Sequence, residues 1–216
     1  MPRAESGASA GPPEPESTRD AILRTAGQVF LEHGYEQSSM DEIALKAGVA
    51  RRTLYNNFAS KKALFDATIA KLWERMPLDA VIDATAESRP PEEVLYAIGS
   101  TIANFWAPPE AVTFLRLVIW ESARFPELRD SFLDNGRSPA RRAVVNFVRQ
   151  LSQKRGYRID DPDLAAAQFI DVILGEVLLN RLIAGQPPPL DDDRSDYLVR
   201  EAVELFLARY RRSKRS

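Results

Sequence analysis

The sequence contains no cysteine and only one histidine, His33, among its 216 residues. Without cysteine the chain can form no disulfide and offers no thiolate for metal binding or redox chemistry, which fits a reducing cytoplasm. It also has no Ser/His/Asp set, no zinc-ligand set and no glycine-rich phosphate loop. We therefore expect a protein that is not an enzyme and that holds no metal and no cofactor.

Long apolar runs are missing as well. No stretch reaches the roughly 20 apolar residues that a membrane span requires. Arg3 is the only basic residue near the N-terminus, where no apolar run follows, so no signal peptide is predicted. Residues 1–16 are rich in proline, glycine and glutamate and are predicted to be a disordered tail. The hydrophobic content of 44% still suffices for a core, so we expect a soluble globular protein without a membrane partner.

Positive and negative charges nearly balance over the whole chain, but not over its first part. The formal net charge is only −2, which argues against a chain that coats nucleic acid nonspecifically. Within residues 17–63, seven lysines and arginines face five acidic residues, so the excess of positive charge is local.

The stretch 38–58 is predicted to form a helix, a turn and a second helix. Ser38 or Ser39 can cap the first helix, with Glu42 placed as in a capping box. Gly48 supplies the positive φ that a tight turn between helices needs. The second helix carries an apolar side and an opposite polar side, made respectively of Leu54, Tyr55 and Phe58, and of Arg51, Arg52 and Asn56.

The run 48–64, together with Ile43-Ala44 and Gly34-Tyr35 before it, closely resembles the N-terminal module of TetR/AcrR-type transcriptional regulators. The resemblance extends from about Thr18 to Phe65. Ala50 departs from it, because the family often has a hydroxyl residue there as the helix cap. The resemblance implies a DNA-binding domain over 17–63 and a helical effector-binding and dimerisation domain over 64–216.

The same resemblance implies roles on double-stranded DNA. Arginine can grip a guanine edge in the major groove with two hydrogen bonds, whereas contacts to phosphate position the protein without reading sequence. The alternative for the arginines is a solvated basic face. The residues expected to read bases are Arg51, Arg52, Thr53 and Asn57, and those expected to meet phosphate are Ser39, Tyr55 and Lys61.

The remainder is predicted to be helical, so the fold class is all-α: a three-helix DNA-binding module plus a larger helical domain. A first helix starts at Ser17 or Thr18 and ends at Gly34, and a fourth, capped by Ser60, runs to Pro77. Further helices are expected at about 91–106, 109–124, 126–134, 138–155, 162–184 and 193–212. Acidic clusters at Asp160–Asp163 and Asp191–Asp193 directly precede helices, where they favour the dipole rather than bind metal.

Segments 162–184 and 193–212 are apolar on more than one face. A monomer has difficulty hiding both faces, so we expect a homodimer joined by a four-helix bundle. The residues assigned to this interface are Leu178, Leu182 and Phe206.

An effector cavity is implied by the resemblance, because no residue pattern identifies a ligand. The expected cavity residues are Trp106, Phe114, Trp120 and Phe169, with Arg116 or Glu176 as polar anchors. It stays open whether these anchors bind a ligand or pair with one another.

The favoured function is a homodimeric repressor released from a pseudo-palindromic operator by a small, mostly apolar effector. An activator of the same fold is one alternative. A helical ligand carrier or protein-interaction module without DNA binding is the other.

Overall fold

The computed structural model describes residues 16–184 and 190–212, and in these ranges every regular element is a helix. The all-α prediction is therefore confirmed. The tail predicted over 1–16 lies outside the described residues except for Glu16.

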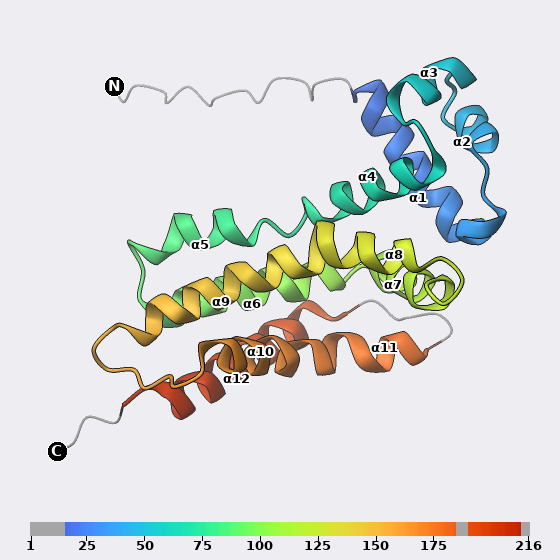
Figure 1. Ribbon diagram of the computed structural model, residues 1–216. Coiled ribbons are helices and arrows are strands. Elements are labelled where there is room, and N and C mark those ends of the chain that lie inside the picture. Colours follow the sequence, from blue (N-terminus) through green and yellow to red (C-terminus); the bar gives the residue numbers. More distant parts are fainter. Residues whose placement is uncertain (1–15, 185–189, 213–216) are drawn as a thin grey trace, which may run out of the picture.

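Three helices form a module at one end of the molecule (Figure 1): α1 (Thr18–Gln37), α2 (Met40–Lys46) and α3 (Arg51–Asn57). The predicted caps are confirmed, since the Ser17 hydroxyl accepts the Asp20 N–H at 3.0 Å and the Ser39 hydroxyl accepts the Glu42 N–H at 3.1 Å. The stripe predicted for α1 is fully buried and forms the core of this module with Ile43 and Leu54; its members are Ile22, Leu23, Ala26, Val29 and Phe30.

Two glycines make the turns that the sequence predicted. Gly48, at φ 68°, reverses the chain between α2 and α3, and the Val49 N–H returns to the Ala44 carbonyl at 3.0 Å. Gly34, at φ 78°, breaks α1 as expected, although the chain regains a helical path as far as Gln37. A residue with a β-carbon would be strained at either position.

Helix α4 (Lys61–Trp73) connects the module to the rest of the chain. Ser60 caps it, as predicted, by accepting the Ala63 N–H at 3.1 Å. Its buried side packs on α1 at one end, and on α8 (Pro126–Phe132) and η1 (Leu133–Arg137) further along. Phe65 stacks on Phe114 at a centroid distance of 5.7 Å, so the core is continuous from one domain into the other.

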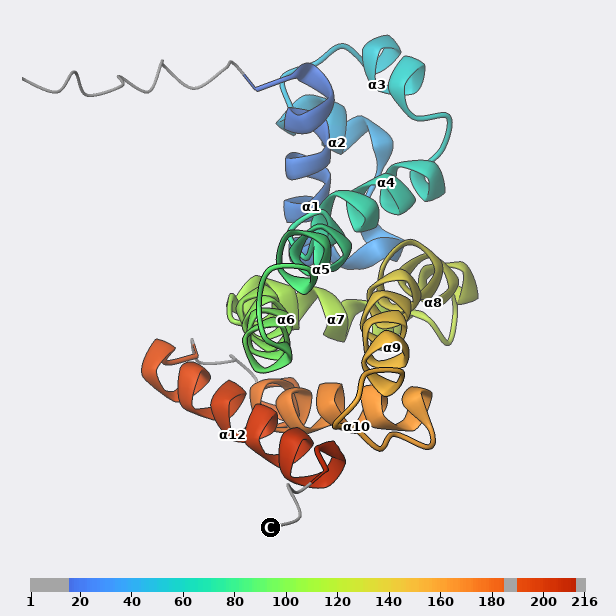
Figure 2. The same ribbon diagram turned by 90° about the vertical axis from the view of Figure 1, so that its left-hand side faces the viewer.

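The larger domain lies beyond α4, with α10 and α12 at the end opposite α3 (Figure 2). Its other elements are α5 (Leu78–Ala86), α6 (Pro91–Trp106), α7 (Pro109–Glu121), α9 (Ser138–Ser152), α10 (Pro162–Leu174), η2 (Gly175–Leu179), α11 (Asn180–Ile183) and α12 (Asp192–Tyr210). Helix α5 was not predicted. The two acidic clusters do start helices, because Asp161 caps α10 and Asp191 caps α12.

Two wider π-helical turns occur, one where the sequence predicts a break between helices at 126–134 and 138–155, and one inside the helix predicted over 162–184. Segment η1 separates α8 from α9, and η2 separates α10 from α11; each contains a glycine, Gly136 and Gly175 respectively. Such turns in α-helices often occur at functional sites, and both lie beside the cavity described below.

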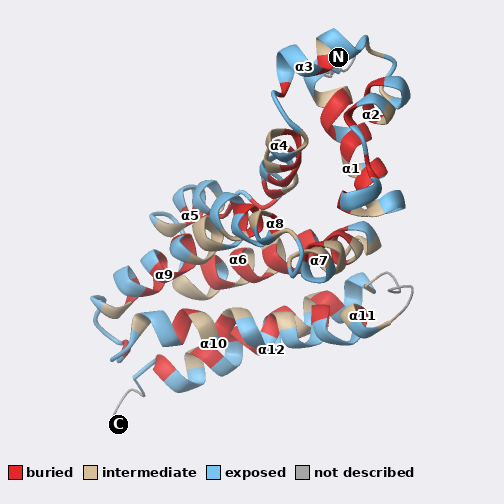
Figure 3. Cartoon of the chain, turned by 45° about the vertical axis from the view of Figure 1, so that its right-hand side comes forward, coloured by how far each residue is buried: buried red, intermediate tan, exposed pale blue. Residues whose placement is uncertain are grey.

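Burial is distributed unevenly over the C-terminal helices (Figure 3). Large apolar side chains are exposed along α10–α12, namely Leu164, Val172, Leu179, Ile183, Tyr197 and Leu205. Among the described residues, the helices are too short or too polar to cross a bilayer.

Candidate DNA-binding surface and regulatory cavity

Helix α3 presents its polar side to solvent. Leu54 is fully buried beneath it, and Phe58 closes its C-terminal end, so the apolar side prediction holds for these two residues. Tyr55, by contrast, is exposed. Ala50 provides no side-chain cap, as expected from the sequence.

The two arginines of α3 differ in their surroundings. Arg51 Nη1 lies 3.0 Å from Asp41 Oδ2 of α2, and its guanidinium lies over the Tyr55 ring at 5.4 Å. Arg52 is exposed and has no ion-pair partner among the described residues. Arg52 can therefore approach a base without first leaving a carboxylate, whereas Arg51 is oriented by one.

The remaining predicted DNA-contacting residues lie on the same end of the module. Thr53 is half-buried, and its carbonyl accepts a hydrogen bond from Asn57 Nδ2 at 2.8 Å. Ser39 is buried less than Ser38 and uses its hydroxyl as the α2 cap, which leaves that hydroxyl able to donate. Tyr55 points out of the module on α3.

Lys61 occupies a different environment from the one predicted. Its Nζ donates to the carbonyls of Tyr35, Glu36 and Ser38 at 2.7, 3.2 and 2.9 Å, and lies 4.5 Å from the Tyr35 ring centroid. An ammonium has three N–H donors, so these bonds employ all of them. Burial lowers the pKa of Lys61, and the nearby carboxylates of Glu121 and Glu36 raise it by a smaller amount. The side chain thus braces the end of α1, and its contact with phosphate stays a prediction.

The end of α7 holds the same end of α1. Glu121 Oε1 accepts the Tyr35 backbone N–H at 3.0 Å, and Arg124 forms a two-pronged ion pair with Glu36 that includes a bond of 2.6 Å. Phe125 meets the Tyr35 ring edge-on at 5.2 Å. The N-terminal three-helix module is therefore fixed to the larger domain through α7 as well as α4.

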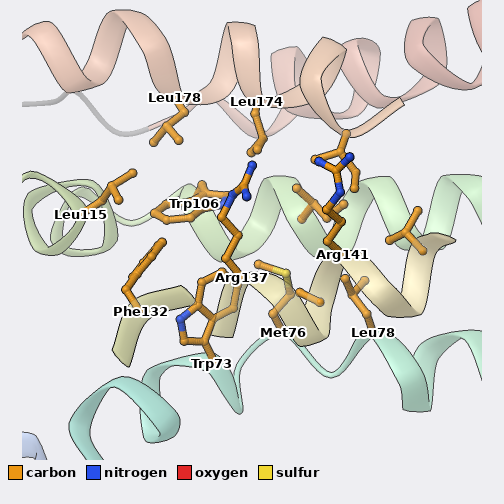
Figure 4. A pocket seen from close by; sticks show the side chains of 14 residues that line it. Trp73, Met76, Leu78, Trp106, Leu115, Phe132, Arg137, Arg141, Leu174 and Leu178 are labelled. Atoms are coloured by element: carbon orange, nitrogen blue, oxygen red, sulfur yellow. The ribbon is translucent and has the colours of Figure 1, made fainter. Parts of the chain in front are cut away.

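A cavity of about 140 Å³ lies between α4, α6, η1, α9, α10 and η2 (Figure 4). Trp73 and Met76, at and just after the end of α4, form one wall, and Leu174 and Leu178 form the opposite wall. The lining is otherwise apolar except for two arginines, Arg137 and Arg141.

Of the six residues predicted for the effector cavity, only Trp106 lines it. Phe114 is buried against Phe65 between the domains, and Phe169 packs on Phe206 at 5.8 Å in the α10–α12 core. Trp120 is 85% exposed and Arg116 lies beside it in a surface hollow between α1 and α7. These placements correct the sequence prediction, which could not tell which side of each helix faces the cavity.

The predicted anchor Glu176 is also placed outside. Its carboxylate is exposed and lies 3.8 Å from Arg194 at the start of α12. A buried charge in this region is Arg181, which is not among the residues predicted from the sequence. It donates to the carbonyls of Trp106 at 2.5 Å and Ala107 at 2.7 Å. Arg181 so caps the C-terminal end of α6, and its burial lowers its pKa.

Two of the three predicted interface residues are buried inside the protomer. Phe206 is 4% exposed and packs on Phe169 and Tyr210, and Leu178 is 9% exposed in the cavity wall. Leu182 is half-buried. The neighbours Leu179 and Leu205 are each 58% exposed instead, so the outward face lies one residue away from the predicted positions.

An exposed polar helix after a glycine turn, on a helical module that α4 and α7 join to a helical domain with a cavity, is the arrangement of the class of helix-turn-helix regulators. Comparison with known proteins identifies the family. Residues 22–68 match the model of bacterial regulatory proteins of the tetR family, and residues 93–212 match the C-terminal domain of AefR-like transcriptional repressors. The chain belongs to the TetR family of transcriptional regulators, which are not enzymes.

Curated relatives match either the module or most of the chain. The HTH-type transcriptional repressor BepR of Brucella suis is 42% identical over 69 residues, about a third (32%) of each chain. The uncharacterized HTH-type transcriptional regulator YdeS of Bacillus subtilis is 26% identical over 194 residues, 89% of each chain.

Solved structures match over nearly the whole length. The flavonoid-responsive regulator FrrA is 31% identical, with 92% of this chain and 98% of that chain covered and a TM-score of 0.71. A TetR-family regulator from Mesorhizobium loti has a TM-score of 0.79 at 23% identity, covering 90% and 97% of the two chains, and shares the fold.

Proposed function

We propose that this protein is a homodimeric transcriptional repressor that binds a pseudo-palindromic operator and is released by a small, mostly apolar effector in the cavity between α4, α6 and α10. It acts in the cytoplasm, where its DNA partner is found. The observation that carries this proposal is that α4 begins in the DNA-binding module and ends in the cavity wall.

DNA reading is assigned to the exposed side of α3. Its residues Arg51, Arg52, Thr53 and Asn57 sit on a short helix that follows a glycine turn, which is the arrangement that places side chains in the major groove. Ser39 and Tyr55 are the candidates for phosphate contact. The Lys61 bonds to three carbonyls support a bracing role for that residue.

The cavity is coupled to α3 through two connections. Trp73 at the end of α4 lines the cavity, and Lys61 at the start of α4 is bonded to the end of α1. Leu115 of α7 also lines the cavity, and Glu121 of the same helix holds Tyr35 of α1. A ligand that moves either wall changes the angle of α3 relative to the α3 of the second protomer. The two helices then no longer fit two successive major grooves at once, so the dimer is released from DNA.

Effector release and repression receive support from the relatives. BepR is named a repressor, the C-terminal match is to AefR-like repressors, and FrrA is named flavonoid-responsive. Because FrrA is 31% identical over 92% of this chain, control by a small, mostly apolar molecule is the natural extension to this protein.

Dimerisation is assigned to the exposed apolar side of α10–α12. Val172 and Leu179 lie seven residues apart on α10 and η2, and Leu205 is exposed on α12. A second copy would bury these side chains against the same face of its own, as in a two-fold bundle.

The test of this function is operator binding with and without ligand. Fragments flanking the gene, and sites selected from random DNA, are titrated with the full chain by fluorescence anisotropy at several salt concentrations. Sequence-selective, salt-dependent binding to a two-fold site supports the proposal, whereas indifference to sequence favours a carrier or interaction module without DNA binding. A promoter reporter then separates repression from activation.

A further inference from the structure

The lining of the cavity is mostly apolar, but the charged side chains in it are all positive. Fourteen of the described residues line the cavity; among these the charged ones are Arg137 and Arg141, and none is an aspartate or a glutamate. The other lining residues include Trp73, Met76 and Trp106, so a ligand meets an apolar chamber with two positive charges at one side.

The two arginines act from the same face of one continuous helical segment. Arg137 ends η1 and Arg141 follows four residues later in the first turn of α9, a spacing that brings side chains together. In Figure 4 both guanidinium groups extend from this segment toward the opposite wall, and that of Arg137 ends next to Leu174. The two guanidinium groups therefore lie near the wall of the cavity that α10 and η2 form.

Neither guanidinium is neutralised by the protein. Arg129 on α8 pairs with Asp130 at 2.7 Å and Arg149 on α9 pairs with Asp163 at 3.2 Å, but no ion pair joins Arg137 or Arg141 to a carboxylate in the described part of the chain. Arg137 is exposed and Arg141 is half-buried, so water solvates them when the cavity is empty.

Occupation of the cavity changes that balance. A neutral ligand covering Arg141 would remove water from a cation without replacing the lost hydrogen bonds, and a cationic ligand would add repulsion. A carboxylate accepts two parallel N–H bonds from one guanidinium, and a second arginine nearby strengthens its binding. The lining thus favours an anion over its neutral or cationic counterparts.

Size restricts the rest of the ligand. The cavity volume is about 140 Å³. A dry cavity of about this volume accepts a benzene molecule. The part of the ligand that the cavity encloses is consequently about the size of a single aromatic ring or a medium-length aliphatic chain.

We propose that the effector is an apolar carboxylate whose body lies among Trp73, Met76 and Trp106 and whose carboxylate is held by Arg137 and Arg141. This inference rests on the proposed function of the cavity as the effector site, and adds the sign of the ligand's charge and the residues that select it.

Matched pairs of probes test the inference. Binding of 4-ethylbenzoate and 4-ethylbenzamide, and of octanoate and octanamide, is measured by calorimetry on the full-length protein, the double variant Arg137→Gln/Arg141→Gln and the control Arg142→Gln. Arg142 is exposed, lies on the same helix and does not line the cavity. Circular dichroism verifies that all variants are folded, and Arg141→Lys tests a retained charge without the planar fork.

We expect at least one carboxylate to bind the parent at least tenfold more tightly than its amide. The double variant should lose at least tenfold of that affinity and bind acid and amide within about twofold of each other, while Arg142→Gln behaves like the parent. An amide that binds as tightly as its acid, a preference that survives in the double variant, or no binding of any probe up to millimolar concentration overturns the inference. Operator affinity measured without ligand on the same preparations reports separately on the proposed function.

Discussion

Glu121 at the end of α7 accepts a hydrogen bond from the backbone N–H of Tyr35 at 3.0 Å, directly after the glycine that breaks α1. A β-carbon at Gly34 would lie 2.7 Å from the same carboxylate oxygen. The glycine is therefore needed twice: for its backbone conformation and for the approach of the carboxylate. This contact joins the DNA-binding module to the domain that contains the cavity.

Replacement of Glu121 by alanine should weaken this connection between the DNA-binding module and the larger domain. A hydrogen bond to a charged group contributes about 1.5 to 3 kcal/mol, so we expect Glu121→Ala to lower the free energy of unfolding by that amount and to weaken operator binding. Urea unfolding and anisotropy measure the two effects. Glu110→Ala, at an exposed position on the same helix, is the control and should change neither; equal losses in both variants would contradict the assigned role.

Replacement of Arg52 should relax the reading of one base pair. Because Arg52 has no carboxylate partner in the described structure, its side chain is available for a guanine edge. We expect Arg52→Ala to cost about 1 to 3 kcal/mol on the operator and almost nothing on an operator changed at the contacted pair. Anisotropy with a set of single-base operator variants identifies the pair, and a uniform loss over all sequences would assign Arg52 to phosphate.

Replacement of Lys61 should show whether its ammonium stabilises the fold or contacts phosphate. Removing a phosphate contact lowers the slope of log K against log salt by about 0.9. Because its ammonium already donates to three carbonyls, we expect Lys61→Met to reduce the melting temperature and operator affinity but to leave that slope unchanged. A slope reduced by one charge with an unaltered melting temperature would restore the phosphate role that the sequence suggested.

Two glycines in π-helical segments should respond to alanine with opposite signs. A β-carbon at Gly136 would fall 1.8 Å from Trp73 Nε1, whereas one at Gly175 meets nothing within 4 Å. Gly136→Ala should cost about 1 to 3 kcal/mol by displacing the end of α4, while Gly175→Ala should stabilise the fold by about 0.4 to 1 kcal/mol. Thermal unfolding of the pair decides, and a neutral Gly136→Ala would show that Trp73 can move without resistance.

The exposed face of α10–α12 should control assembly. Placing a carboxylate at Leu205 would bury an unpaired charge in the interface, so Leu205→Asp should give folded monomers by light scattering. Phe206→Asp should instead unfold the protomer, because Phe206 is in its core. Leu45→Asp, exposed on α2, serves as the control and should remain dimeric; a dimeric Leu205→Asp would place the interface elsewhere.

Much of the DNA-binding module could be predicted from sequence because its signals are local. Ser17, Ser39 and Ser60 cap helices through side chains within three residues, and Gly34 and Gly48 fix turns by their own conformations. These features depend on short-range chemistry, so the chain order alone specifies them.

The cavity and the interface could be predicted less well, because both depend on how helices rotate about their axes. A helix apolar on several faces gives no sign of which face meets a partner, so Phe206 and Leu178 were assigned outward although their neighbours Leu205 and Leu179 are the exposed ones. Helix α5 has a short run of only nine residues after a proline and offered too little periodicity. Lys61 was assigned by its position in a motif, and its carbonyl partners lie more than 20 residues away.

Arg137 and Arg141 belong to η1 and α9, whose main neighbours are α8, α4, α5 and α10, and α3 is not among them. On the proposed function, a substitution at these arginines would change which molecule the protein binds in the cavity and would leave the residues proposed to read bases unchanged. Descendants of such a chain would keep their target genes and acquire new inducers by changes at a few cavity positions. On this proposal the ligand specificity and the DNA specificity would be inherited separately, although α4 connects the two sites.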